Sequence, residues 1–299
     1  MFRVREQIGL NKVFVPRKGE GVAVAVLDTG CAQHPDLHNR IKLFCDFVHG
    51  ESGIYDDNGH GTHVCGILCG SGAESGGRFA GIAPGVDLIV GKVLDAFGEG
   101  TMEQMSAALD WILQCKNRYP IRVLNISIGP GESGNFEKRE KLQTHLKKIS
   151  DRGISVFCAA GNNGPSNASA SGLGYDKEII MVGCHDGNFY KNNLSRCAAY
   201  SGRGDINKGI RKPDIVAPGT NIISCNNQFL NRPYISRSGT SMATPIIAGI
   251  AALVYSNYPN MSPDDFKKRL LYTARDLGEP WNLQGWGMVS AERILNHGI

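Results

Sequence analysis

Uninterrupted apolar runs recur along the chain and predict buried strands. The first covers residues 21–27, Gly-Val-Ala-Val-Ala-Val-Leu, and its β-branched character is typical of a strand buried on both faces of a parallel sheet. Similar runs follow at 87–93, 121–128, 154–160 and 179–183. Between them, 102–116 and 136–152 repeat apolar residues at spacings of three to four, which predicts helices.

This alternation of strands and helices predicts a single α/β domain of three layers, with a mostly parallel central sheet flanked by helices on both faces. Ligands of such sheets bind beyond the carboxyl ends of the strands, so chemistry is expected at that edge. No stretch of the chain has the composition of a linker, and there is no internal repeat. We therefore expect one domain over 15–299, preceded by a short N-terminal extension at 1–14.

A late helix is predicted from Ser262 to about Arg275. Ser262 suits the N-cap, Pro263 suits the first turn, and Asp264 and Asp265 face the positive helix end. Nothing in this segment suggests chemistry, so we expect it to be scaffold.

Charge and composition give no reason to expect a nucleic acid or an anionic membrane as a partner. The chain has 32 Lys and Arg against 28 Asp and Glu, a formal net charge of +4 over 299 residues, and the charges are dispersed. This balance provides no electrostatic case for binding nucleic acid or an anionic membrane. The N-terminus lacks the apolar run of a secretory signal and no later segment reaches transmembrane length, so a cytoplasmic location is expected.

The nine cysteines fit that expectation. Their number is odd, they form no CxxC pair, and most lie within apolar strings. We expect reduced thiols that act as small buried hydrophobes. Cys65 and Cys69 share a helical face, but two thiols without further ligands at zinc spacing argue against a structural zinc.

Two histidines lie three positions apart in DNGHGTHVC (57–65). A metal-binding pair is expected at HExxH spacing with a glutamate between, and this stretch has neither. His60 is flanked by glycines and should begin a buried apolar helix, with His63 about 4.5 Å deeper. The positive helix end favours a neutral imidazole, the form that a general base needs. His60 is thus a candidate base, and His63 a packed, hydrogen-bonded residue.

A serine stands before the most apolar predicted helix, 246–255. Ser241 lies in SGTSMATP (238–245), and because Pro245 fits only early in a helix, Ser241 is expected near the N-terminus. There, oriented N–H groups favour a developing negative charge. An isolated serine of this kind would be a simple N-cap, but Gly239 and Ala243 leave room for a substrate backbone.

Asp28 directly follows the strand at 21–27. Alone it fits a turn-capping aspartate equally well. With His60 and Ser241 it gives the set that acyl transfer requires: Ser241 as nucleophile, His60 as the base, and Asp28 to fix the imidazole tautomer. The chain order Asp, His, Ser is that of subtilisin, and the G-x-S-x-G sequence of an α/β-hydrolase does not surround Ser241.

Eight segments resemble, in order, the motifs of subtilisin-like serine peptidases. They are DTG (28–30), HPDL (34–37), GHGTHV (59–64), AGIAPG (80–85), VLNISIG (123–129), AAGNNGP (159–165), KPDIVAPG (212–219) and SGTSMATP (238–245). The similarity covers nearly the whole chain. It implies a subtilisin-like fold and a serine endopeptidase without cofactor, acting on peptides or unfolded proteins with a broad, apolar preference. With no signal and many cysteines, the chain is similar to the intracellular branch of the family.

The resemblance also implies roles for further residues. Asn162 in AAGNNGP should donate its amide to the oxyanion together with the N–H of Ser241, although taken alone it could equally be a turn residue. The substrate should pair with an edge strand and lie against one wall of a specificity pocket, where flanking glycines let a peptide backbone approach. The residues implied for these two features are Gly98, Glu99 and Gly100, and Ser127, Ile128 and Gly129, respectively.

The chain departs from the family pattern in its calcium loop. Secreted relatives bind a tight calcium through an Asn-rich loop after the histidine helix, and residues 70–78 lack those side chains. Asp36 is one carboxylate, whereas calcium takes six to eight oxygens. We predict that the tight site is absent and leave weak calcium binding open.

Two other functions are alternatives to hydrolysis, and only the second of them would use the same residues. A catalytically silent scaffold has no need of all four groups, and a peptide ligase or cyclase would need insertions that exclude water, which we do not find. The segment 1–14 is the one candidate for an internal inhibitor, and our hypothesis is that it lies across the cleft.

Overall fold

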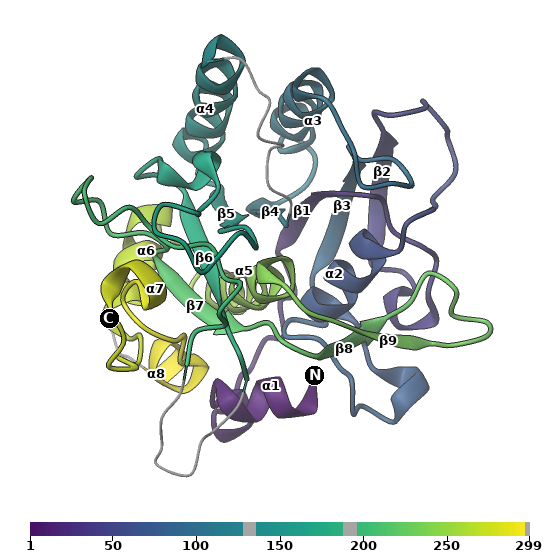
Figure 1. Ribbon diagram of the computed structural model, residues 1–299. Helices are drawn as coiled ribbons and strands as arrows, with labels where there is room; N and C mark the ends of the chain where they lie inside the picture. The colour runs from purple at the N-terminus through teal and green to yellow at the C-terminus, as the bar shows by residue number, and fades with distance from the viewer. Residues whose placement is uncertain (128–135, 188–195, 297–299) are drawn as a thin grey trace.

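The computed structural model describes residues 1–127, 136–187 and 196–296. Its centre is a parallel sheet with strand order β2-β3-β1-β4-β5-β6-β7 (Figure 1). The strands are β1 (Ala23–Asp28), β2 (Ile41–Asp46), β3 (Asp87–Lys92), β4 (Ile121–Ile126), β5 (Ser155–Ala159), β6 (Ile180–His185) and β7 (Ile215–Pro218). From β1 the chain crosses to the edge at β2, returns through β3, and then continues on the other side of β1 from β4 to β7, so the strand order reverses at β1. In parallel sheets such a point opens a crevice at the carboxyl edge.

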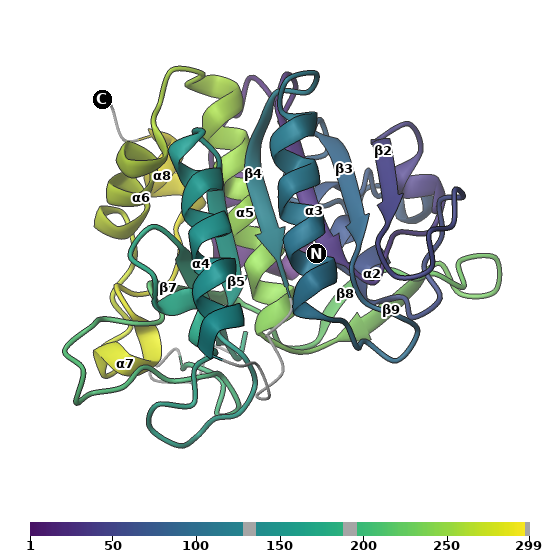
Figure 2. The same cartoon turned by 90° about the horizontal axis from the view of Figure 1, so that it is seen from above.

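Helices cover both faces of this sheet. On one face lie α2 (His60–Cys69) and α5 (Thr240–Asn257), and on the other α3 (Met102–Cys115) and α4 (Phe136–Asp151). Figure 2 looks down on α3 and α4, with the sheet behind them. The remaining helices, all peripheral, are α1 (Phe2–Gln7), α6 (Pro263–Tyr272), α7 (Trp281–Gln284) and α8 (Ala291–Asn296). The expected three-layer α/β domain is confirmed.

All five strands that the apolar runs predicted are present, with ends that differ by at most two residues. The structure adds β2 and β7, which the pattern did not indicate. β2, Ile-Lys-Leu-Phe-Cys-Asp, is an edge strand that carries two charges, and β7 has four residues. The late helix α6 has the predicted N-cap, since Ser262 Oγ accepts from the Asp265 N–H at 3.1 Å. It ends three residues before Arg275, whose backbone pairs with Met288.

A two-stranded antiparallel ribbon packs against α2. It consists of β8 (Ile222–Cys225) and β9 (Tyr234–Arg237), and Figure 1 shows it on the opposite side of the sheet from α3. Four-residue strands with mixed burial give too weak a periodic signal to be predicted. The ribbon leads directly into α5 and so positions the segment before Ser241.

The hypothesis that residues 1–14 lie across the cleft is wrong. Met1, Val4, Ile8 and Leu10 are all buried in the same hydrophobic core as α2 and α5. The Ile8 carbonyl accepts from the N–H of Ala291, the first residue of α8, at 2.7 Å. The segment folds back because Met1, Val4 and Ile8, spaced three and four apart along α1 and its caps, pack into this core.

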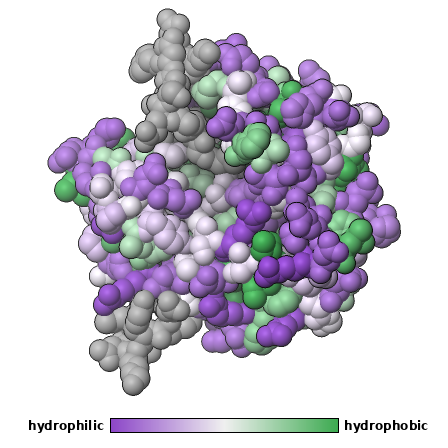
Figure 3. Space-filling view, turned by 45° about the vertical axis from the view of Figure 1, so that its right-hand side comes forward, coloured by the Kyte–Doolittle hydropathy of each residue, from purple (hydrophilic) through white to green (hydrophobic). Residues whose placement is uncertain are grey.

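The cysteine prediction is confirmed. All nine are free, and all but Cys45 and Cys197 are buried. Burial raises the pKa of the Cys158 thiol to about 12. In the described parts of the chain, no helix combines the length and apolar character needed to cross a bilayer. The face of the molecule in Figure 3 is mostly hydrophilic, with apolar side chains in small separate groups.

Candidate active site

His60 is the first residue of α2, as predicted, and the glycines around it serve the backbone. Gly59 has φ +92°, which other residues adopt only with strain. A Cβ at Gly61 would lie 2.1 Å from the Gly30 carbonyl oxygen. Gly59 therefore permits the turn into α2, and Gly61 allows the loop that follows β1 to lie directly against the first turn of that helix.

That contact brings Asp28 and His60 together. His60 Nδ1 donates to Asp28 Oδ1 at 2.6 Å, and the same oxygen accepts from the Thr29 N–H at 2.8 Å. The Asp28 side chain is fully buried, whereas that of His60 is 21% exposed. The hydrogen bond fixes the tautomer with the proton on Nδ1, so Nε2 is left as the basic nitrogen.

Electrostatics favour protonation of His60. Burial disfavours the charged ring, but the charge and the hydrogen bond of Asp28 outweigh it, and the pKa of His60 is raised above its usual value. Asp56 adds to this effect and Arg237 opposes it. An imidazole held in this way can accept a proton and stabilise the imidazolium that results.

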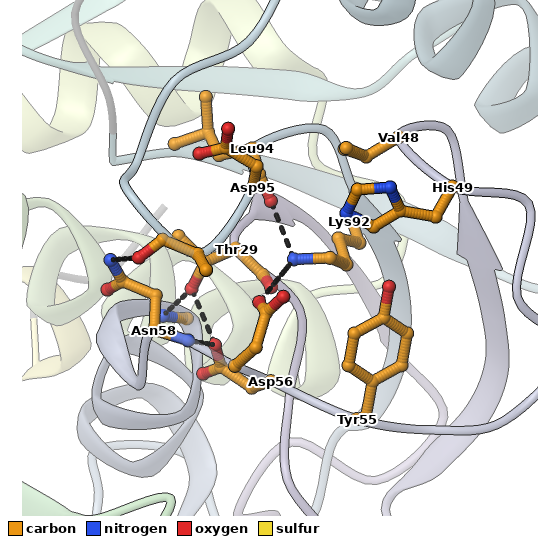
Figure 4. A network of polar contacts seen from close by, with 12 residues as sticks. Thr29, Val48, His49, Tyr55, Asp56, Asn58, Lys92, Leu94 and Asp95 are labelled. Carbon is orange, nitrogen blue, oxygen red and sulfur yellow. Dashed lines mark hydrogen bonds and ion pairs between the residues drawn. The ribbon is translucent and has the colours of Figure 1, made fainter.

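Asp56 organises the loop between β1 and α2, a role the sequence did not reveal. Its Oδ1 accepts from Thr29 Oγ1 at 2.9 Å and from the Gly59 N–H at 2.8 Å (Figure 4). Its Oδ2 accepts from the Thr62 N–H and hydroxyl at 2.8 and 2.6 Å. One carboxylate thus satisfies the N–H groups of Gly59 and Thr62 at the start of α2 and connects that helix to the loop carrying Asp28.

A fully buried lysine supports the same loop from the sheet. Lys92, at the end of β3 and in register with Asp28, donates from Nζ to Asp57 at 2.7 Å. It also donates to the carbonyls of Thr29 at 2.9 Å and Leu94 at 2.7 Å (Figure 4). The Lys92 side chain is the kind of buried charge that is tolerated only when paired and hydrogen-bonded.

Ser241 is the second residue of α5, near the N-terminus as predicted. The segment before it contacts the residues just ahead of α2, since Arg237 Nη2 donates to the Asn58 carbonyl at 3.4 Å. Within the described ranges Ser241 Oγ makes no hydrogen bond, so the structure joins Asp28 to His60 but does not show the contact of His60 with Ser241. Such contacts are often long before a substrate binds.

Asn162 lies at the N-terminus of α5. Its Oδ1 accepts from the Thr240 N–H at 3.0 Å and from the Thr240 hydroxyl at 3.2 Å. A Cβ at Gly239 would lie 3.3 Å from Asn162 Nδ2. With its oxygen anchored in this way, Asn162 presents its amide donor beside the residues that precede Ser241.

The substrate-binding residues implied by the resemblance are only partly described. Gly98, Glu99 and Gly100 are exposed and form a turn, not the expected strand: the Glu99 N–H donates to Asp95 Oδ1 and its carbonyl accepts from the Asp95 N–H, both at 2.9 Å. In the free chain, Asp95 thus engages both backbone groups of Glu99. Ser127 is buried and accepts from Asn125 Nδ2 at 2.8 Å. Ile128 and Gly129 lie outside the described residues.

His63 joins α2 to the ribbon, as a packed residue. It is fully buried, and its Nε2 lies 3.0 Å from the Ile222 carbonyl and 3.1 Å from the Ile235 carbonyl. Burial, helped by the charge of Arg237, lowers its pKa to about 3, so it is neutral at ordinary pH. The interpretation of the two histidines as an asymmetric pair is thereby supported.

Asp36 is satisfied by protein donors and does not fit a calcium site. Its Oδ2 accepts from the Tyr234 hydroxyl at 2.7 Å, and its Oδ1 from the Glu74 N–H at 3.1 Å and the Ser71 hydroxyl at 3.3 Å. His34 and Cys225 lie near enough to share a metal with it. However, Nδ1 of His34 accepts from the Asp36 N–H, and burial raises the pKa of the Cys225 thiol well above its usual value.

Comparisons with known proteins agree with this geometry. The profile of the Subtilase family (peptidase S8) matches residues 19–287. The chain is 39% identical over 295 residues to serine protease AprX of Bacillus subtilis, covering 93% of this chain and 66% of that protein. It is 37% identical over 291 residues to subtilisin BL of Lederbergia lenta, covering 95% and 96%.

Solved structures give the same result. The structure titled Sphericase superposes with a TM-score of 0.84 at 27% identity and covers 97% of each chain. A structure titled S41 Psychrophilic Protease has a TM-score of 0.83 at 29% identity, again with 97% coverage of both. The parallel sheet, the Asp28–His60 pair at its carboxyl edge and these matches lead to one conclusion: the chain belongs to the subtilase family and is a subtilisin-like serine endopeptidase.

Proposed function

We propose that Asp28, His60 and Ser241 act as a catalytic triad for the hydrolysis of peptide bonds. The observation that carries this proposal is the 2.6 Å hydrogen bond from His60 Nδ1 to the buried Asp28, which leaves Nε2 as the base. Nε2 takes the proton of Ser241 as its oxygen attacks the carbonyl carbon, then gives it to the leaving amine. Water repeats the sequence to release the acyl group.

The oxyanion of the tetrahedral intermediate is stabilised by Asn162 and by the backbone N–H of Ser241. The anchored Oδ1 of Asn162 supports this role, because a preorganised donor needs no reorientation during the reaction. Peptides and unfolded proteins are the proposed substrates. We expect a broad, apolar preference for the residue before the scissile bond, which would bind against Ser127, Ile128 and Gly129. Free cysteines fit our expectation of a cytoplasmic location.

Digestion of a reduced, denatured protein tests the proposed activity. We expect the wild-type chain to yield many internal fragments and Ser241→Ala none. A silent scaffold would produce no fragments from either, and a ligase would join peptides that carry a free amine in preference to hydrolysing them. Either result would contradict endopeptidase activity.

Removal of calcium is expected to leave activity and stability unchanged. The donors that surround Asp36 belong to the chain itself, so no cation is needed to neutralise its buried carboxylate. Thermal unfolding and peptide hydrolysis should be measured in a chelator and in excess calcium. A lower melting temperature in the chelator, restored by calcium and absent in Asp36→Asn, would disprove this prediction.

A further inference from the structure

Arg237, the last residue of β9, is a cation beside the candidate active site without a carboxylate partner. It lies four residues before Ser241 and is partly buried. Its Nη2 makes one long hydrogen bond, 3.4 Å, to the Asn58 carbonyl, and its Nε is buried without a partner. Across the described parts of the chain, no Asp or Glu oxygen is within 4 Å of this guanidinium. The Arg237 guanidinium therefore has N–H donors that are not used by hydrogen bonds within the described parts of the chain.

Arg237 is connected to His60 through hydrogen bonds to Asn58. Asn58, its contact, is two residues before His60, and Asn58 Oδ1 accepts from the His60 N–H at 3.1 Å. The charged groups that act on His60 are Asp28, Asp56 and Arg237. For His60 and His63 alike, burial is the main influence that disfavours the charged ring, and the charge of Arg237 adds to it.

The fold indicates which part of a substrate would meet Arg237. Gly98–Gly100 lead into α3 and Ser127 follows β4, so the residues before the scissile bond would approach from the α3 side of the carboxyl edge. Arg237 belongs to the ribbon that packs against α2, on the other side of the sheet (Figure 1). A substrate that crosses this edge would place the residues after the scissile bond near Arg237.

We propose that Arg237 binds a carboxylate side chain of the substrate on the leaving-group side, so that the chain prefers peptides with Asp or Glu just after the scissile bond. This inference rests on the proposed endopeptidase function. A guanidinium presents paired N–H donors that match a carboxylate, and this geometry is not available to Lys. When His60 takes the Ser241 proton, the positive charge of Arg237 repels the imidazolium that forms. A substrate carboxylate bound to Arg237 would neutralise that charge, so an Asp or Glu after the scissile bond should raise kcat as well as lower KM.

Three synthetic peptides test the inference. The first has Glu at the two positions after the scissile bond, the second has Gln at those positions, and the third has Glu at the position before the bond. The peptides otherwise share one sequence. For the wild type we expect kcat/KM about fivefold higher with Glu after the bond than with Gln, because a partly exposed ion pair is weak. The preference should shrink as salt is added, and Glu before the bond should give no gain.

Variants of the β8–β9 ribbon test whether Arg237 causes the preference for Glu after the scissile bond. Arg237→Gln should abolish it, Arg237→Lys should retain part of it, and Arg232→Gln, the same charge change at an exposed residue of the ribbon's turn, should leave it intact. The acid limb of the pH profile of kcat/KM should move to higher pH in Arg237→Gln, because loss of the cation raises the pKa of His60. Arg232→Gln should not move it.

The outcomes separate the inference from the function on which it rests. Equal hydrolysis of the Glu and Gln peptides by the wild type, or a preference that survives in Arg237→Gln, would overturn the role of Arg237 while leaving the endopeptidase proposal intact. No hydrolysis of any peptide, or the same hydrolysis by Ser241→Ala, would overturn both.

Discussion

Ser241→Ala and His60→Ala are each expected to lower kcat by about 10⁶-fold, the scale measured in subtilisin for its own serine and histidine. The physical reason is that the two residues carry out one proton transfer, so loss of either removes the whole nucleophilic route. The double variant should therefore be no slower than either single one. Hydrolysis of a chromogenic peptide under saturating substrate provides the measurement.

Both variants should remain folded. Ser241 Oγ makes no hydrogen bond in the described ranges, and the His60 ring is partly exposed with one side-chain partner. His60→Ala does leave the buried Asp28 without that partner, so we expect a loss of stability of about 1–3 kcal/mol. Turnover in either variant within tenfold of wild type, with the fold unchanged, would contradict the assigned roles.

His63→Ala is expected to act on stability in the first place, with a loss of about 3 kcal/mol. It removes a fully buried side chain and leaves the carbonyls of Ile222 and Ile235 without their donor. The ribbon would lose its link to α2, and the residual effect on turnover should follow from that. Denaturant unfolding in a Ser241→Ala background, which prevents self-digestion, gives the free energy, and the exposed His49→Ala is the matched control.

The same variant should show a distinctive pH dependence. The pKa of His63 is lowered to about 3 in the folded chain, and an unfolded histidine titrates near 6.5. Between these values the unfolded state binds more protons, so the wild type loses stability as the pH falls, by up to about 1.4 kcal/mol per unit from this group. The difference in free energy of unfolding between wild type and His63→Ala should therefore become smaller below pH 6.5. Equal losses of turnover in His60→Ala and His63→Ala, with unaltered stability, would undo the distinction between them.

Local sequence patterns predicted the parts of the fold that are local in origin. The run at 21–27 is buried on both faces, and that environment selects an unbroken apolar string that can be read directly. The same holds for the apolar α5 and for the position of Ser241 at its start. The ribbon β8–β9 and the edge strand β2 are short and partly exposed, so their sequences carry little periodic signal.

The supporting residues of the site could not be predicted because their roles depend on contacts between distant segments. Lys92 looks like the charged end of an apolar strand, and only the pairing of β3 with β1 shows that it holds the Thr29 carbonyl. Asp56 carried a local signal for part of its role, since an acid three residues before Gly59 and close to a helix start is typical of an Asx turn or cap, but its bond to Thr29 depends on a distant segment. Arg237 carried none, because its neighbour Asn58 is 179 residues away along the chain.

The fold also corrected what the sequence suggested about 1–14, and it describes the free-chain conformation of 98–100. Apolar residues in a short terminal segment are consistent with an inhibitor that fills a cleft or with an extra piece of core, and the packing of Val4 and Ile8 decides for the core. A glycine-flanked segment suits an edge strand or a turn, and the bonds of Glu99 to Asp95 decide for the turn in the free chain. Pairing of 98–100 with a substrate stays a prediction.

Labelling with a fluorophosphonate tests the central claim, that Ser241 is a nucleophile activated by His60. The reagent phosphonylates an activated serine, and peptide mass mapping identifies the modified residue. We predict one label per chain, on Ser241, formed in the wild type and lost in both Ser241→Ala and His60→Ala, while His63→Ala still reacts wherever it is folded. Absence of the label from the folded wild type, its presence on another serine, or an unchanged rate in His60→Ala would contradict the account.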